Sequence, residues 1–109
     1  MPNKDAMPPA AQLTVQAILQ LHPNIEKAIL FGSRALGTHS PSSDIDLAVV
    51  GENLTLESLG RLASEFDESS LPVFVDVLRY DTIKSEPLRE HIARYGKMLW
   101  ERSNSAIRS

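Results

Sequence analysis

The stretch Ile29-Leu30-Phe31-Gly32-Ser33-Arg34-Ala35-Leu36-Gly37, continued by Ser43-Asp44-Ile45-Asp46-Leu47-Ala48-Val49-Val50, decides the fold of this chain. It predicts an apolar strand, a Gly-Ser turn into a short helix, a polar loop and a second strand. Residues i and i+2 of a strand share a face, so Asp44 and Asp46 are expected to point the same way. Ile45, Leu47 and Val49 then point the other way, as a row that faces the core.

Two carboxylates held side by side repel each other, by about 4 kcal/mol at ~4 Å and an effective dielectric near ~20. A hard divalent cation with oxygen ligands offsets this repulsion, and Mg²⁺ is typical where phosphates complete the shell. Gly32 lets the backbone approach a phosphate closely, and free N–H groups at a helix start favour an anion. The strand-turn-strand unit therefore predicts phosphoryl or nucleotidyl transfer.

Hydrophobic periodicity predicts the elements around this unit. Helices are predicted over 10–21, 55–68 and 88–95, and strands over 25–31, 44–50, 73–78 and 97–101. Leu13 and Leu21 belong to the apolar pattern of the first helix. Thr55 and Ser85 are expected to be helix N-caps.

Asp76 lies inside the valine-rich segment 73–78, where a carboxylate is unusual for a core strand. If this segment pairs beside 44–50, Asp76 stands on the same face as Asp44 and Asp46. It is then the expected third metal ligand. The alternative is an acid on the surface of an edge strand.

The spacing of these residues resembles a known signature. Gly32-Ser33, ten intervening residues (34–43) and then Asp44-x-Asp46 resemble the motif of the DNA-polymerase-β-like nucleotidyltransferase superfamily. The extended form, Gly-Ser-Arg-Ala-x-Gly running to Ser-Asp-Ile-Asp-Leu, resembles its minimal nucleotidyltransferase branch, over roughly residues 10–101. The resemblance implies an α+β fold (a two-layer α/β nucleotidyltransferase fold), with a mixed sheet, helices packed on one face and the active site on the other.

The resemblance also implies a reaction. Asp44, Asp46 and Asp76 would be the catalytic residues and would bind two Mg²⁺ ions, and Asp76 would take the proton from the attacking hydroxyl. Gly32 and Ser33 would contact the triphosphate of ATP. The implied acceptor is a tyrosine of a HEPN-type toxin protein, which would make this chain the antitoxin of the pair. The alternative function is a non-catalytic antitoxin that blocks its toxin by steric contact.

The cationic and imidazole side chains near the motif leave alternatives open. Arg34 is assigned with Gly32 and Ser33 to nucleotide binding, where it would neutralise the triphosphate or meet the partner; otherwise it lies along the surface. Similarly, Ser33 is either a phosphate contact or only an N-cap. His39 is expected to be a solvated loop residue; the alternative is a residue that touches the leaving pyrophosphate. His22 and His91 are assigned structural or surface positions, because no metal-ligand spacing links the three histidines.

Composition bounds the remaining possibilities. The 109 residues predict a single nucleotidyltransferase domain over 10–101, with a disordered N-terminal tail (1–9) and a frayed C-terminal tail (102–109). The net charge of −3, with scattered lysines and arginines, disfavours a nucleic-acid substrate. The absence of cysteine fits a reducing cytosol, and with no signal-peptide pattern and no long apolar run we expect a cytoplasmic protein without a membrane segment.

Overall fold

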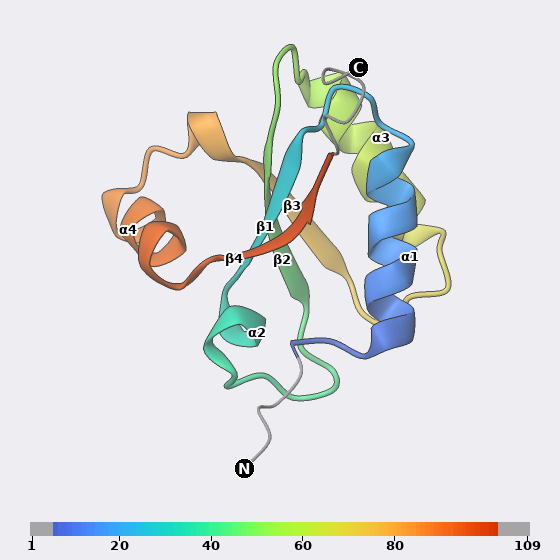
Figure 1. The fold of residues 1–109 in the computed structure, drawn as a ribbon, viewed down its shortest axis with the longest axis vertical. Helices are drawn as coiled ribbons and strands as arrows, with labels where there is room; N and C mark the ends of the chain where they lie inside the picture. Colours follow the sequence, from blue (N-terminus) through green and yellow to red (C-terminus); the bar gives the residue numbers. More distant parts are fainter. Residues whose placement is uncertain (1–5, 103–109) are drawn as a thin grey trace, which may run out of the picture.

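The computed structural model describes residues 6–102, which form a four-stranded mixed sheet in the order β3-β2-β1-β4 (Figure 1). The strands are β1 (Lys27–Phe31), β2 (Ile45–Val50), β3 (Val75–Arg79) and β4 (Lys97–Glu101). The helices are α1 (Pro9–Gln20), α2 (Ser33–Leu36), α3 (Leu56–Asp67) and α4 (Glu86–Tyr95), with a 3₁₀ turn, η1, at Tyr80–Thr82. β1 runs antiparallel to both β2 and β4, whereas β2 and β3 are parallel. No helix within residues 6–102 is long and apolar enough to cross a membrane.

Helices α1 and α3 lie together on one side of the sheet and enclose the main core (Figure 1). Strand β2 contributes Ile45, Leu47 and Val49 to the centre of this core, because alternate residues of a strand point to the same face. The largest fully buried side chains include Leu19, Leu30, Ile45, Leu47, Leu62 and Phe66. The fully buried residues of α1 are Val15 and Leu19. Leu13 and Leu21, which belong to the apolar pattern of the predicted helix, are 68% and 72% exposed and face solvent.

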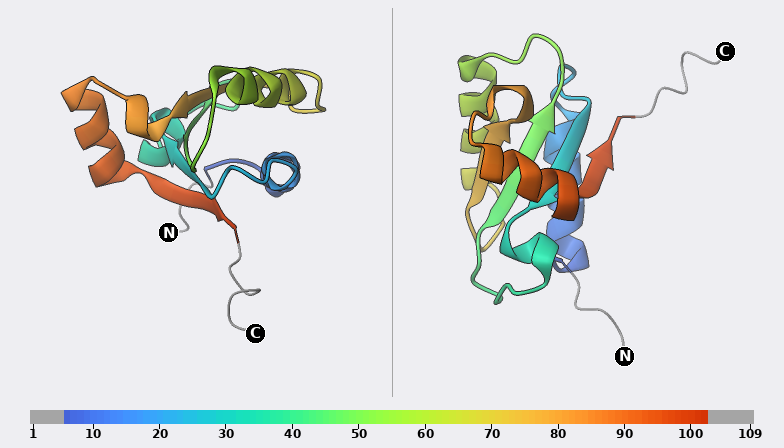
Figure 2. Two further views of the ribbon diagram at one scale, coloured as in Figure 1. Left: turned by 90° about the horizontal axis from the view of Figure 1, so that it is seen from above. Right: turned by 90° about the vertical axis from the view of Figure 1, so that its left-hand side faces the viewer.

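Helix α4 lies on the opposite side of the sheet from α1 and α3, as the view from above shows (Figure 2). A second, smaller core explains its position: Phe31, Ala48 and Ile92 are buried together there. The expected α+β fold with a mixed sheet is confirmed. Helix α4, however, covers part of the face on which the active site was expected, because Phe31 of β1 and Ala48 of β2 present apolar side chains there.

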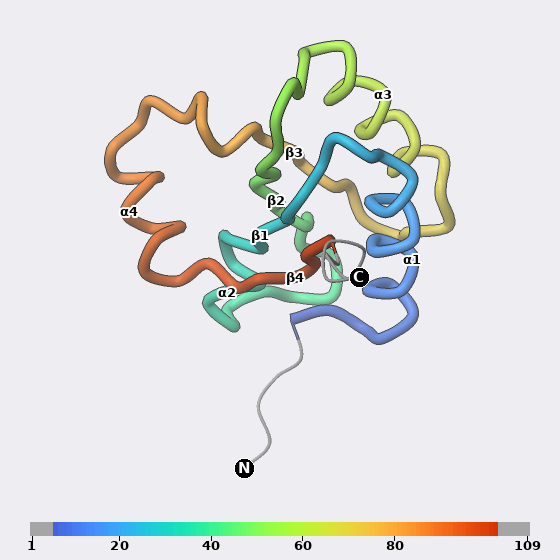
Figure 3. Tube along the Cα trace, turned by 45° about the horizontal axis from the view of Figure 1, so that its top comes forward, coloured from blue at the N-terminus to red at the C-terminus, as the bar shows by residue number. Residues whose placement is uncertain are grey.

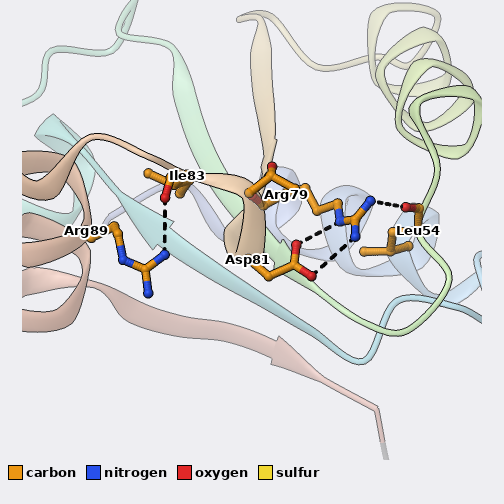
Figure 4. Close-up of polar contacts among 6 residues, drawn as sticks. Leu54, Arg79, Asp81, Ile83 and Arg89 are labelled. Atoms are coloured by element: carbon orange, nitrogen blue, oxygen red, sulfur yellow. Dashed lines mark hydrogen bonds and ion pairs between the residues drawn. The ribbon is translucent and has the colours of Figure 1, made fainter.

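The segment between β3 and α4 is held by two arginines (Figure 4). Arg79 Nε donates to Asp81 Oδ1 over 2.7 Å, and its Nη1 donates to the carbonyl of Leu54. Arg89 Nη1 donates to the carbonyl of Ile83 over 3.2 Å. The Cα trace in Figure 3 follows the chain from β3 to α4 along this segment. These bonds fix where α4 begins relative to the sheet.

Both predicted N-caps are confirmed. The side chains of Thr55 and Ser85 accept hydrogen bonds from the N–H groups of Ser58 and Leu88, at 3.0 and 3.3 Å. Each bond satisfies one of the free N–H groups that a helix start leaves.

The folded unit extends past the predicted domain limits at both ends. Met7 is buried, with 3% of its surface exposed, and the Ala6 carbonyl accepts a bond from Arg34 at 2.8 Å. Residues 6–9 therefore belong to the fold rather than to a disordered tail. At the other end, the Arg102 N–H and guanidinium donate to the carbonyls of residues 22, 25 and 26. The rest of the predicted tails, 1–5 and 103–109, lies outside the described residues.

Candidate active site

Asp46 and Asp76 are register partners on neighbouring strands. The pairing of β2 with β3 places Asp46 opposite Asp76, flanked by the pairs Ile45–Val75 and Leu47–Val77. Register partners in a sheet project to the same face, so the two carboxylates lie on the side opposite the buried Ile45 and Leu47. Asp76 is exposed and Asp46 is half-buried. The predicted pairing of these two segments is confirmed.

Asp44 precedes β2, which begins at Ile45, and its side chain is exposed. The charge of Asp44 nevertheless acts on the Asp46 carboxylate. Burial, followed by the charges of Asp76 and Asp44, raises the pKa of Asp46. The charges of Asp44 and Asp76 therefore both act on the Asp46 carboxylate.

Gly32 lies directly against Asp46. Phe31 ends β1 opposite Asp46, and Gly32 follows with φ 77° and ψ −155°, a backbone conformation that only glycine adopts readily. A Cβ atom at this position would collide with Asp46 Oδ2. The glycine of the turn is thus required both by the backbone conformation and by the carboxylate beside it.

Ser33 begins α2, a single turn of helix at the end of β1 (Figure 1). The Gly32 carbonyl accepts the N–H groups of Ala35 and Leu36, both at 3.1 Å, and Gly37 ends the turn at φ 82°. Ser33 therefore directly follows the glycine that touches Asp46. This places the two residues predicted to contact phosphate at the edge of the carboxylate group.

Arg34 is buried, with 3% of its surface exposed, and does not lie along the surface. Each of its three guanidinium nitrogens donates to a main-chain carbonyl, and the acceptors are Ala6, Pro41 and Ser43. We therefore assign Arg34 to holding the loop that leads into Asp44, in place of the expected contact with the triphosphate or the partner. Its donors are already engaged with the protein.

His91 bonds the Gly-Ser turn, although no sequence pattern predicts this contact. The Gly32 N–H donates to His91 Nε2 over 3.0 Å, across 59 residues of chain. No short motif includes His91, so only the packing of α4 reveals the contact.

Of the other histidines, His39 is buried (8% exposed), against the expectation of a solvated residue. His22 contacts Glu65 at 2.7 Å, consistent with a structural position.

The donor set of the site is suited to a hard cation. Within residues 6–102, no three His, Cys, Asp or Glu side chains are arranged to hold a metal ion by themselves. Asp46 and Asp76 nevertheless offer carboxylate oxygens on adjacent strands, with Asp44 nearby. Mg²⁺ at phosphate-transfer sites commonly uses one or two carboxylates and completes its shell with substrate phosphate and water. The residues present fit that pattern.

Comparison with known proteins adds to this geometry. The model of the family described as "Polymerase beta, Nucleotidyltransferase" matches residues 14–105. A curated relative, the probable protein adenylyltransferase MntA of Haemophilus influenzae, is 38% identical over 76 residues, which are 69% of this chain and 66% of the relative. The match thus spans just under two thirds of the relative's length.

Two solved structures share the fold. A chain in a toxin–antitoxin crystal structure with AMP-PNP is 28% identical, with a TM-score of 0.70, over 86% of this chain and 76% of that one. A chain in the toxin–antitoxin MntA–HepT structure is also 28% identical, with a TM-score of 0.59, over 84% of this chain and 73% of that one.

Proposed function

Because this chain belongs to the polymerase-β nucleotidyltransferase family, in its minimal branch, we propose that it transfers AMP from ATP to a hydroxyl group of a partner protein. The observation that carries the proposal is the meeting of three motif parts at one place. Asp46 lies opposite Asp76 on the next strand, and Gly32 packs against the Asp46 carboxylate. A phosphate-binding turn and an acidic pair side by side are what nucleotidyl transfer needs.

Each residue of the site has a distinct role in this proposal. Gly32 and Ser33 would receive the triphosphate: Ser33 offers a hydroxyl, and Gly32, which has no Cβ, lets the turn pack directly against the Asp46 carboxylate. Asp44, Asp46 and Asp76 would hold Mg²⁺, which when bound neutralises the charge that builds up on the phosphate oxygens. Asp76, which is exposed on an edge strand, would accept the proton of the incoming hydroxyl.

The reaction balances without a covalent enzyme intermediate. The acceptor oxygen forms a bond to the α-phosphorus of ATP, the bond from that phosphorus to the bridging oxygen breaks, and pyrophosphate leaves. The hydroxyl proton passes to the Asp76 carboxylate. The product is an AMP ester on the partner.

We propose a tyrosine of a HEPN-type toxin as the acceptor, with this chain as the antitoxin. Support comes from the family resemblance and from the similar structures, which are toxin–antitoxin complexes, one of them with AMP-PNP. A phosphate ester on the toxin adds negative charge and bulk at the modified side chain, which would silence a site that contains it.

The test is incubation of the purified chain and its toxin with Mg²⁺ and ATP labelled on either the α- or the γ-phosphate. Label on the toxin from the α position alone supports adenylyl transfer, whereas label from the γ position alone indicates a kinase and contradicts the proposal. The double variant Asp44→Asn, Asp46→Asn separates catalysis from steric blocking. A catalytic antitoxin loses protection of its partner in this variant, and a steric one keeps it.

A further inference from the structure

A ring nitrogen from α4 holds the turn that carries the proposed phosphate site. The Gly32 N–H donates to His91 Nε2 over 3.0 Å, which ties the end of β1 to α4. Because the main-chain group is the donor, Nε2 must be the acceptor, and the neutral ring carries its proton on Nδ1. The imidazole is therefore bonded to the main chain of the Gly-Ser turn itself.

Packing fixes the orientation of this ring. Phe31 meets it edge-on, with ring centres 6.2 Å apart at 77°, and Tyr95 lies 5.5 Å away at 44°. The neighbouring Ile92 is buried in the small core with Phe31 and Ala48. A ring with aromatic neighbours on two sides, on a helix anchored in a core, presents its nitrogen in one direction.

The start of α4 is also fixed. Arg89 bonds the carbonyl of Ile83, and its guanidinium lies 5.5 Å from the centre of the Tyr80 ring (Figure 4 shows the bond to Ile83). Ser85 caps the first turn. The helix is held at its start and by the buried Ile92 next to His91, so the His91 ring has a defined position relative to the turn.

We propose that His91 is a positioning residue of the transferase site: its Nε2 holds the Gly32 peptide so that Ser33 and Asp46 stay aligned for the triphosphate. Gly32 needs such a partner because a glycine has no side chain to restrict its backbone. The inference rests on the proposed function and adds a residue to it. His91 acts through Gly32 in this account and touches neither ATP nor the acceptor.

Three variants test the role of the nitrogen. His91→Phe preserves an aromatic ring but removes the acceptor, and His91→Gln restores an acceptor oxygen. His91→Met gives a second apolar replacement if the phenylalanine variant does not fold. We expect His91→Phe to raise the KM for ATP about ten- to hundredfold, the range typical of lost supporting contacts, with a smaller fall in kcat. We expect His91→Gln to recover most of the loss.

A second readout does not depend on activity. Hydrogen exchange at the Gly32 amide, followed by NMR on the full chain, should accelerate in His91→Phe and slow again in His91→Gln. His22→Phe is the matched control, because His22 bonds Glu65 rather than the turn. It should leave both the Gly32 exchange rate and the KM for ATP unchanged.

Two results would overturn the inference. The first is wild-type Gly32 exchange and wild-type KM in His91→Phe. The second is restored exchange without restored KM in His91→Gln, which would mean that the ring touches substrate. If the wild-type chain transfers no nucleotide, the proposed function fails, and the Gly32 exchange rates alone still decide whether His91 holds the turn.

Discussion

The carboxylate of Asp46 occupies the space that a side chain at Gly32 would need. This relationship joins the two halves of the motif physically, because the glycine of the turn and the second aspartate of the pair pack against each other. The ten residues between Ser33 and Asp44, which include most of α2, must therefore bring the chain back beside Gly32. Arg34 makes this return possible by bonding the carbonyls of Pro41 and Ser43.

Replacing Gly32 by alanine should damage both stability and transfer. The new Cβ requires an unfavourable φ of 77° and collides with the Asp46 carboxylate, so we expect a loss of about 1–3 kcal/mol in the free energy of unfolding. Urea unfolding measures this loss. The matched control is Gly60→Ala, within α3, where a Cβ meets nothing within 4 Å and φ is not positive. That change should stabilise the protein by about 0.5–1 kcal/mol. Equal effects at the two glycines would contradict the assigned strain.

Asparagine at position 46 should stabilise the metal-free protein at neutral pH. The folded pKa of Asp46 is raised above its usual 3.8, chiefly by burial and then by Asp76 and Asp44, so the folded chain binds the proton more tightly than the unfolded chain. That contribution is present below about pH 3.8 and is lost as the pH rises through the folded pKa. At pH 7 the ionised Asp46 therefore lowers stability, and Asp46→Asn should raise the unfolding free energy.

The size of this gain is limited by solvent. Because Asp46 is only half-buried, we expect less than about 1 kcal/mol. The measurement is thermal unfolding in EDTA at a series of pH values, and the difference between Asp46→Asn and wild type should shrink toward acid pH. A difference that grows on acidification would show the sign to be wrong.

Truncation of Arg34 should unfold the loop that precedes Asp44. Arg34→Ala removes a buried side chain and leaves the partly buried carbonyls of Ala6 and Ser43 without their donor, and we expect a loss of about 2–4 kcal/mol in the free energy of unfolding. The control is Arg61→Ala, since Arg61 makes only an exposed ion pair with Glu57, for which a change within about 0.5 kcal/mol is expected. If Arg34→Ala is as mild as Arg61→Ala in denaturant unfolding, the structural role of Arg34 is wrong.

Removal of the Asp76 charge should abolish transfer while leaving the fold intact. Asp76 is exposed, so Asp76→Asn has little effect on packing, but it removes a proposed metal ligand and the proposed proton acceptor. We expect a fall in kcat of at least about 100-fold, measured with α-labelled ATP. Asp67→Asn, an exposed acid at the end of α3, should retain full activity. Comparable rates for the two variants would remove Asp76 from the mechanism.

Much of the candidate site could be predicted because its signals are local. The Gly-Ser turn, the Asp-x-Asp pair and the valine-rich strand with its single acid are each contained in a few residues, where periodicity and turn chemistry act directly. The first helix was harder. Its apolar pattern runs around more than one side, so which leucines face the core depended on the sheet, and Leu13 and Leu21 proved to be exposed.

By itself the sequence determined the strand-turn-strand unit, the spacing of its glycine and aspartates, and the two helix caps, since these depend on backbone preferences within a few residues. Only the tertiary structure decided three further points: that Asp46 and Asp76 are register partners, that Arg34 turns inward to the carbonyls of its own loop, and that His91 meets Gly32. The physical reason is the same in each case. These contacts join groups whose approach depends on how strands pair and helices pack, and no local preference of the chain encodes the distance between them.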